Sequence, residues 1–162
     1  MIILRMYWRI RSLVKTLLYR VLFGGRFVFL FDSTFRRNFG VYLGKGARIA
    51  VGHNVFFNRG CSINCLESVE IGDNCIFGEN VKIYDQNHRF ADRNEIIRNQ
   101  GYSIAPVKIG GGCWICTNTV ILKGVTIGEH SVIGAGCVVS QDIPAYSIVR
   151  NRMDLMVEEL RK

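Results

Sequence analysis

The chain has 162 residues, which is enough for one domain with a sizeable core, and its formal net charge is +8. A surplus of positive charge favours anions in general, but this chain is built from regular repeats, so we expect no nucleic-acid partner. Three of the six cysteines, Cys75, Cys113 and Cys137, fall on small inward positions of those repeats, where a thiol is a compact apolar filler. We therefore expect reduced thiols, a cytoplasmic protein and no metal site, although Cys113 and Cys116 form a CxxC.

Residues 1–23 predict an amphipathic helix. One polar face recurs at spacings of four, three, four and four residues, and it consists of Arg5, Arg9, Ser12, Thr16 and Arg20. The remaining surface is apolar and aromatic, but charges interrupt it too often for a spanning helix or a signal peptide. Two interpretations stay open: the helix caps one end of the repeat domain, or it lies in the plane of a membrane and binds anionic lipid through its arginines and Trp8.

Gly24 and Gly25 end this helix, and residues 26–37 read as an aromatic, basic connector without a clear period. The repeat begins near Leu43, and its first coils are irregular. We assign residues 1–40 to the helix and connector and residues 41–149 to the repeat domain. Residues 150–162 are expected to form a short helix that caps the other end of the repeats.

A strict period of six organises residues 109–144, which read IGGGCW, ICTNTV, ILKGVT, IGEHSV, IGAGCV and VSQDIP. Each hexad opens on Ile or Val, and its fifth residue is small or β-branched. A helix would repeat its apolar residues every three or four positions and a flat strand every second one, so neither fits. Two inward residues and one tight corner in each hexad predict a mainly β fold, a parallel β-helix of the hexapeptide type.

The regular repeat is interrupted by residues 84–106, which have no hexad and are rich in charged and amide side chains. We expect them to leave the coil as a loop, and a long ordered loop in a compact domain is usually functional. His88 is the only one of the three histidines in this loop. His53 and His130 occupy corners of hexads and are expected to be solvated.

These features together resemble the hexapeptide-repeat acyltransferases, and in particular the sugar and polysaccharide O-acetyltransferases of the maltose, galactoside and capsule or lipopolysaccharide type. The resemblance rests on the hexads, on the insertion that opens YDQNH and on the run GCWICTNTVILKGVTIGEHSVIGAGCVVSQDIPA, and it covers about residues 43–147. It implies a left-handed β-helix that forms a homotrimer. It also implies acetyl-coenzyme A as co-substrate in the cleft between two subunits, a sugar or glycan as acceptor, and no required metal.

His88 lies where this family carries its catalytic histidine. Transfer of an acetyl group to a hydroxyl needs a base, because a neutral alcohol is a poor nucleophile toward a thioester, and imidazole titrates near neutral pH. Asp85 is a candidate for fixing the tautomer of His88, and a backbone carbonyl could serve equally. Asn58 matches the family's asparagine that contacts the acceptor hydroxyl and the oxyanion, but it could equally be a turn residue with a left-handed backbone.

The resemblance also assigns residues to the cofactor. Trp114 matches the tryptophan that lines the cofactor or acceptor cleft, and the oxyanion donor maps to the backbone N–H of Cys116 or Thr117. Bare backbone for the pantetheine arm would come from Gly134, Ala135 and Gly136. The candidates for the cofactor phosphates are Lys123, Arg150 and Arg152. The chain departs from the family in two places: Cys116 replaces the more usual glycine, and SIVRNRMD replaces the turn that packs on the adenine.

We predict an acetyl-coenzyme A-dependent O-acetyltransferase that serves envelope or capsular polysaccharide biosynthesis, with peripheral contact of residues 1–23 with the inner face of a membrane. Three alternatives stay open. An acetyltransferase for xenobiotics or nucleotide-sugar amines would carry a longer acceptor loop or an extra domain, and a non-catalytic platform would not direct His88 into a subunit cleft. A metal hydrolase of the carbonic anhydrase type would need closely spaced histidines, whereas His53, His88 and His130 are far apart.

Overall fold

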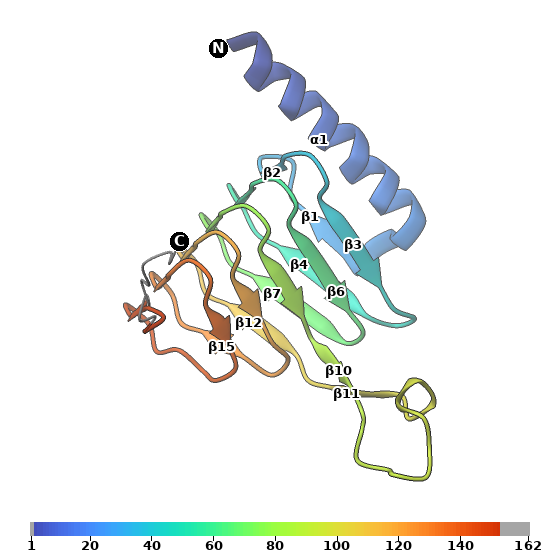
Figure 1. Ribbon diagram of the computed structural model, residues 1–162. Helices are drawn as coiled ribbons and strands as arrows, with labels where there is room; N and C mark the ends of the chain where they lie inside the picture. Colours follow the sequence, from blue (N-terminus) through green and yellow to red (C-terminus); the bar gives the residue numbers. More distant parts are fainter. Residues whose placement is uncertain (1, 153–162) are drawn as a thin grey trace, which may run out of the picture.

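A computed structural model describes residues 2–152, and the side chains from residue 6 onward. The chain forms a parallel β-helix, preceded by helix α1 (Ile2–Phe23) and the short 3-10 helix η1 (Gly24–Arg26) (Figure 1). The predicted mainly β fold with an N-terminal helix is therefore confirmed. The predicted C-terminal helix lies almost entirely outside the described residues.

Three parallel sheets form the sides of the β-helix. Sheet A contains β1 (Phe27–Phe29), β4 (Arg48–Val51), β7 (Ser68–Ile71), β12 (Val107–Ile109) and β15 (Thr126–Ile127). Sheet B contains β2 (Thr34–Phe35), β5 (Phe56–Phe57), β8 (Ile76–Phe77), β13 (Trp114–Ile115), β16 (Val132–Ile133) and β18 (Ile148–Val149). Sheet C contains β3 (Gly40–Leu43), β6 (Ser62–Cys65), β9 (Lys82–Tyr84), β14 (Val120–Ile121) and β17 (Val138–Val139). Each coil passes from A to B to C, and we name corner BC and corner CA for the two sheets that each corner joins.

Each hexad directs two side chains into the column, as its pattern predicts. The opening residues, such as Ile115, and the fifth residues, such as Thr119, are buried. Parallel pairing stacks like on like, since Ile115 lies in register between Phe77 and Ile133. Thr119 satisfies its buried hydroxyl by donating a hydrogen bond to the carbonyl of Cys116, 2.8 Å away. The interior is therefore a column of apolar side chains with a few thiols and bonded hydroxyls.

The β-helix begins earlier than the sequence pattern indicates. Strands β1 and β2 lie within residues 26–37, which we expected to be a connector. The first coils are longer than three hexads: Phe29 pairs with Val51, 22 residues on, whereas Ile109 pairs with Ile127, 18 residues on. The interior of these coils is filled by buried phenylalanines, and Phe77 continues the set in the next coil: Phe27, Phe29, Phe35, Phe39 and Phe57 precede it. The predicted boundary at residue 41 is therefore too late, because the longer coils hide the period of six.

Helix α1 lies over the end of the β-helix that β1, β2 and β3 form (Figure 1). Its inward face is mixed: Ser12 and Thr16 are buried there, and Tyr19 and Phe23 pack against the core beside them. The Ser12 hydroxyl accepts a hydrogen bond from the N–H of Phe35, 3.1 Å away. The helix caps the end of the column, as one of the two interpretations predicts. The other interpretation rests the polar face on lipid, whereas Ser12 and Thr16 of that face point toward the protein. The first coil leaves backbone groups there without a further coil to bond.

The interrupting loop is a β-hairpin rather than an irregular segment. Strand β10 (Gln86–His88) pairs with the antiparallel strand β11 (Tyr102–Ile104), and a 3-10 helix, η2 (Ile97–Asn99), lies between them. The hairpin leaves the β-helix at corner CA, after β9, and returns to it at β12. It projects from the side of the column (Figure 1).

Candidate active site

His88 is the last residue of β10 and is exposed on the hairpin. Its register partner on β11 is Tyr102, and the two ring centroids lie 4.5 Å apart with the planes tilted by 41°. Within the described residues we find no hydrogen bond to the imidazole ring. Both ring nitrogens are therefore available to a ligand.

The other two histidines are held by neighbours at the surface. His53 Nδ1 lies 3.0 Å from Asp32 Oδ2, and this hydrogen bond lowers the pKa of Asp32. His130 has a left-handed backbone, with φ of 54°, and stacks on Tyr146 with 5.3 Å between ring centroids. Both are exposed corner residues, as the sequence predicts.

Two pockets meet at His88. One has a volume of about 520 Å³ and lies between the hairpin and Lys123 of corner CA, with Phe90 and Glu95 in its wall. The other has a volume of about 390 Å³ and is lined by Tyr84, Gln86, Asn87, Tyr102 and Leu122 besides His88. A ligand in either pocket lies against the imidazole, so His88 can reach two different bound groups.

Asp85 does not contact His88 through a hydrogen bond. Its side chain is fully buried at the root of the hairpin. The carboxylate accepts hydrogen bonds from three consecutive backbone N–H groups, those of Leu66, Glu67 and Ser68, at 2.7–3.0 Å. These bonds occupy both oxygens, so the hypothesis that Asp85 fixes the tautomer of His88 is wrong. Asp85 instead ties the start of the hairpin to the corner between β6 and β7.

Asn58 lies at corner BC and is half-buried. Its Oδ1 accepts a hydrogen bond from the N–H of Arg59, 2.9 Å away, and we find no partner for its Nδ2 within the described residues. The left-handed corner asparagines are other residues, among them Asn54 and Asn74. The interpretation of Asn58 as a left-handed turn residue is therefore wrong, and its amide N–H₂ remains free to bind a hydroxyl.

Cys116 and Thr117 lie at the same corner, two coils further along. The N–H of Cys116 donates to the carbonyl of Ile133, 2.8 Å away, within the ladder that joins neighbouring coils. Cys116 therefore cannot supply the oxyanion donor, which leaves Thr117 of the two candidates. The Cys116 thiol is half-buried. Burial is the larger cause that raises its pKa, and the nearby Cys137 is the smaller one, so the thiol stays protonated at neutral pH.

Trp114 points outward from sheet B, with 52% of its surface exposed. It lies in register between Ile76 and Val132, so three apolar side chains form a row on the outer face of the sheet. Such a row on a regular solenoid is suited to contact a ligand or a second protein surface. Trp114 therefore has the exposure that the family's cleft residue requires.

Gly134, Ala135 and Gly136 form the last described turn of corner BC before the end of the column. A Cβ at Gly134 would lie 2.9 Å from the carbonyl oxygen of Val149, so this position requires glycine. Gly136 has φ of 70°, the left-handed region that also favours glycine. Arg150 follows β18 beside this turn, and Arg150 and Arg152 are both exposed. The structure thus brings together the candidates for the pantetheine arm and a candidate for the phosphates.

The predicted site residues form two groups on different edges of the column. His88 and Lys123 lie at corner CA, whereas Asn58, Thr117 and the turn of residues 134–136 lie at corner BC. Sheet C runs between the two corners. Neither pocket at His88 is lined by a residue of corner BC. One chain alone therefore does not assemble the complete predicted site.

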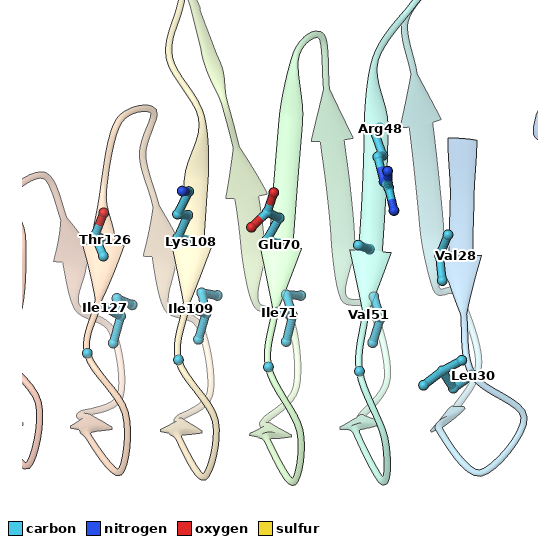
Figure 2. A pocket seen from close by; sticks show the side chains of 15 residues that line it. Val28, Leu30, Arg48, Val51, Glu70, Ile71, Lys108, Ile109, Thr126 and Ile127 are labelled. Atoms are coloured by element: carbon cyan, nitrogen blue, oxygen red, sulfur yellow. The ribbon is translucent and has the colours of Figure 1, made fainter. Parts of the chain in front are cut away.

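A groove of about 770 Å³ crosses the outer face of sheet A, away from both groups. Figure 2 shows Arg48, Glu70, Lys108 and Thr126 projecting from neighbouring strands along this face. Its lining contains no histidine or cysteine and none of the predicted site residues. The groove therefore offers neither an imidazole nor a thiol nucleophile.

Over residues 2–152 we find no cluster of three or more His, Cys, Asp or Glu side chains that could hold a metal ion. The six cysteines are free, and Cys116 alone of them is more than marginally accessible. In the same part of the chain, no helix has the length and apolar character needed to cross a membrane.

Comparison with known proteins agrees with this architecture. Residues 106–141 match the family profile described as bacterial transferase hexapeptide (six repeats). The galactoside O-acetyltransferase of Escherichia coli (strain K12) is 38% identical over 104 residues, which are 64% of this chain and 50% of that protein. The chain spans about half the length of the curated relatives that it matches.

Two solved structures extend the similarity over most of the column. A hexapeptide-repeat acetyltransferase of Vibrio cholerae O1 biovar eltor, solved with acetyl-coenzyme A, is 31% identical, covers 82% of this chain and 68% of its own, and has a TM-score of 0.66. A maltose O-acetyltransferase of Clostridium difficile 630 is 29% identical, covers 96% of this chain and 89% of its own, and has a TM-score of 0.60. The chain belongs to the hexapeptide-repeat acetyltransferase family.

Tyr102 contacts the predicted base but was not among the predicted site residues. Its position opposite His88 depends on the hairpin register, which the loop sequence does not reveal through any apolar period. The local signal that could have indicated a returning strand is Gly101 directly before the short run YSI. In the structure Gly101 has φ of 75°.

Proposed function

We propose that this protein transfers an acetyl group from acetyl-coenzyme A to a hydroxyl of a sugar or glycan in the cytoplasm. Membership of the acetyltransferase family and similarity to galactoside and maltose O-acetyltransferases support the reaction class and the acceptor class. The observation that carries the proposal is the exposed, unbonded ring of His88 on a paired hairpin between two pockets.

His88 acts as the general base. Its neutral imidazole removes the proton of the acceptor hydroxyl while the hydroxyl oxygen attacks the thioester carbonyl. The tetrahedral oxyanion is stabilised by the backbone N–H of Thr117, and Asn58 Nδ2 orients the acceptor. Collapse of the oxyanion breaks the carbon–sulfur bond, and the imidazolium returns its proton to the leaving thiolate. The products are an acetyl ester and free coenzyme A.

Acetyl-coenzyme A is proposed to bind along corner BC. The small, exposed residues Ala135 and Gly136 support this placement, because they let a narrow chain lie close to the coil. Trp114 would line the same cleft, and Arg150 would meet the phosphates of the cofactor, with Arg152 beside it on the chain. Lys123 lies at corner CA with His88, where it is available to an anionic group of either substrate.

The active site is proposed to form between subunits of a homotrimer. The separation of the two residue groups supports this arrangement, because His88 of one subunit would meet corner BC of the next. In a cyclic trimer each such contact is repeated, so three equivalent sites result.

The pathway is proposed to be envelope or capsular polysaccharide biosynthesis, with residues 1–23 in peripheral contact with the inner face of a membrane. The support for this is the position of α1 at one end of the column, away from the hairpin (Figure 1). A membrane-bound protein would meet a lipid-linked glycan where that acceptor is made.

Release of the coenzyme A thiol tests the function. We would measure acceptor-dependent thiol release from acetyl-coenzyme A with a panel of sugars and envelope glycans, for the wild type, His88→Ala, and the control variants His53→Ala and His130→Ala. A general base contributes about 100-fold or more, so His88→Ala should lose at least that factor while both controls keep their rate. A sugar-dependent rate that survives in His88→Ala would reject this base. Absence of acetyl-coenzyme A binding would reject the enzymatic function itself.

A further inference from the structure

The outer face of helix α1 is apolar and uncovered in the described chain. Eight large apolar side chains on this helix are between 48% and 83% exposed: Met6, Tyr7, Ile10, Val14, Leu17, Leu18, Val21 and Leu22. Most of them recur at spacings of three and four residues, which places them along one side of the helix. Helical spacing places one charged residue within this stripe, the exposed Arg11, four residues after Tyr7 and three before Val14.

The rotation of α1 about its axis is set by polar contacts with the first coil. Lys15 Nζ donates to the carbonyl of Phe39, and Arg20 Nη2 donates to the carbonyl of Phe29, 2.8 Å away. Together with the buried Ser12 these bonds fix the polar side inward. The apolar side therefore faces outward as a consequence of bonds that satisfy buried backbone groups.

Positive charge is concentrated at this end of the molecule. The first 60 residues contain eleven arginines and lysines and one acidic residue, Asp32, whereas the remaining residues contain ten basic and twelve acidic residues. Exposed Arg11 and Arg37 both lie over the ring of Trp8, with 5.7 and 5.6 Å from the guanidinium carbon to the ring centroid. A basic, aromatic border thus adjoins the apolar stripe.

We infer that the outer face of α1 docks on an anionic lipid bilayer. The apolar stripe would enter the boundary between headgroups and acyl chains, and the arginines beside Trp8 would meet the headgroup phosphates. A second copy of the chain fits this face poorly, because it would bring the same positive charge against itself. The inference rests on the peripheral membrane contact in the proposed function. It assigns that contact to the apolar stripe, on the side of α1 opposite to the polar face with Arg9 and Arg20.

Vesicle binding tests the inference on the full chain, without acetyl-coenzyme A or acceptor, so that binding is separated from catalysis. The probes are vesicles of phosphatidylcholine alone and of phosphatidylcholine with phosphatidylglycerol. We would compare the wild type with Leu17→Glu on the stripe and with Ile96→Glu in the hairpin. Both positions are exposed, Leu17 to 51% and Ile96 to 65%, and both variants carry the same change of charge. Thiol release with a free sugar is measured on the same proteins.

The wild type should bind the phosphatidylglycerol vesicles much more tightly than the neutral ones. Leu17→Glu should weaken this binding about tenfold or more, because a charge replaces an apolar side chain that enters the bilayer. Ile96→Glu should change the binding less than about twofold. Equal loss in both variants, or no vesicle binding by the wild type, would overturn the inference. So would a change of sedimentation coefficient in Leu17→Glu alone, since this would show that a second copy covers the stripe. If the wild type binds vesicles but releases no thiol, only the proposed enzymatic function is rejected.

Discussion

The ring of His88 lies against the ring of Tyr102, with 4.5 Å between centroids, at the paired end of the β10–β11 hairpin. Antiparallel pairing holds the two residues opposite each other, so the backbone of β11 fixes the position of the Tyr102 ring beside the imidazole. This contact orients the proposed base without occupying either ring nitrogen.

Removing the Tyr102 ring is therefore expected to reduce turnover. Tyr102→Ala should lower kcat/KM about tenfold, because a base displaced by a fraction of an ångström loses part of its reach, whereas Tyr102→Phe keeps the ring and should stay near the wild type. Ile104→Ala, two residues further along the same strand, is the matched control. A rate in Tyr102→Ala equal to that in Ile104→Ala would show that the ring does not position His88.

The carboxylate of Asp85 is expected to matter for stability. Asp85→Ala removes the acceptor of the backbone N–H groups of Leu66, Glu67 and Ser68, so the free energy of unfolding should fall by about 3 kcal/mol. Asp85→Asn keeps one acceptor oxygen and should lose less. Urea unfolding measures both variants against the wild type.

Hydrogen exchange separates this role from direct action on His88. In Asp85→Asn the amides of residues 86–104 should exchange faster, because the root of the hairpin is loosened, and kcat should fall in parallel. If kcat fell while the hairpin exchanged at the wild-type rate, Asp85 would act on His88 directly, which is the role that the structure excludes.

The buried thiols predict a loss of stability at alkaline pH. Burial raises the pKa of Cys61 to about 11 and that of Cys65 to about 12, from an ordinary value of 9.0. The unfolded chain releases these protons at a lower pH than the native state does, so it binds fewer protons in this range. Each thiol should then reduce the free energy of unfolding by about 1.4 kcal/mol per pH unit between its unfolded and folded pKa values.

Urea unfolding of the wild type and Cys61→Ala, at about pH 8 and about pH 10, measures this effect. Other groups titrate in the same range, so the difference between the two proteins is the informative quantity. The variant is expected to lose less stability on going to the higher pH. Equal losses would mean that Cys61 already titrates at its ordinary pKa in the native state.

The hexads made the β-helix and most of its core predictable, because a period of six directs residues such as Ile115 and Ile133 into the interior and stacks them in register. The first coils were not predictable, since their extra residues hide the period and replace aliphatic side chains by stacked phenylalanines such as Phe57 and Phe77, whose centroids are 4.3 Å apart. His88 was singled out because it is the only histidine in the segment that interrupts the repeat. The hydrogen-bond partners of Asp85 could not be predicted, because the N–H groups of Leu66, Glu67 and Ser68 reach it from a corner of the preceding coil.

The sequence left open which side of α1 faces the protein, and there is a physical reason for this. A polar stripe on a helix usually faces water, and the sequence contains no sign that the stripe of Ser12 and Thr16 would meet unpaired backbone instead. The open end of a solenoid differs from the apolar face of an ordinary domain, because it presents N–H and C=O groups. A capping helix can therefore bury its polar side.

The separation of the two residue groups predicts complementation between inactive subunits. Ala135→Trp places a large side chain at an exposed position of corner BC and should block the pantetheine arm, while His88→Ala removes the base. Each homotrimer should be inactive. In mixed cyclic trimers, a site is complete wherever the intact His88 of an Ala135→Trp subunit faces the intact corner of a His88→Ala subunit, which yields about a quarter of the wild-type rate for equal, random mixing.

The measurement is thiol release after the two variants are unfolded together and refolded, with separately refolded and then mixed proteins as the control. Recovery only after joint refolding would support a site shared between subunits, because each variant alone lacks one half of it. No recovery, in trimers that sedimentation shows to be mixed, would mean that both groups act within one chain. The hairpin would then have to swing from corner CA across sheet C, which its antiparallel pairing and the buried Asp85 at its root oppose.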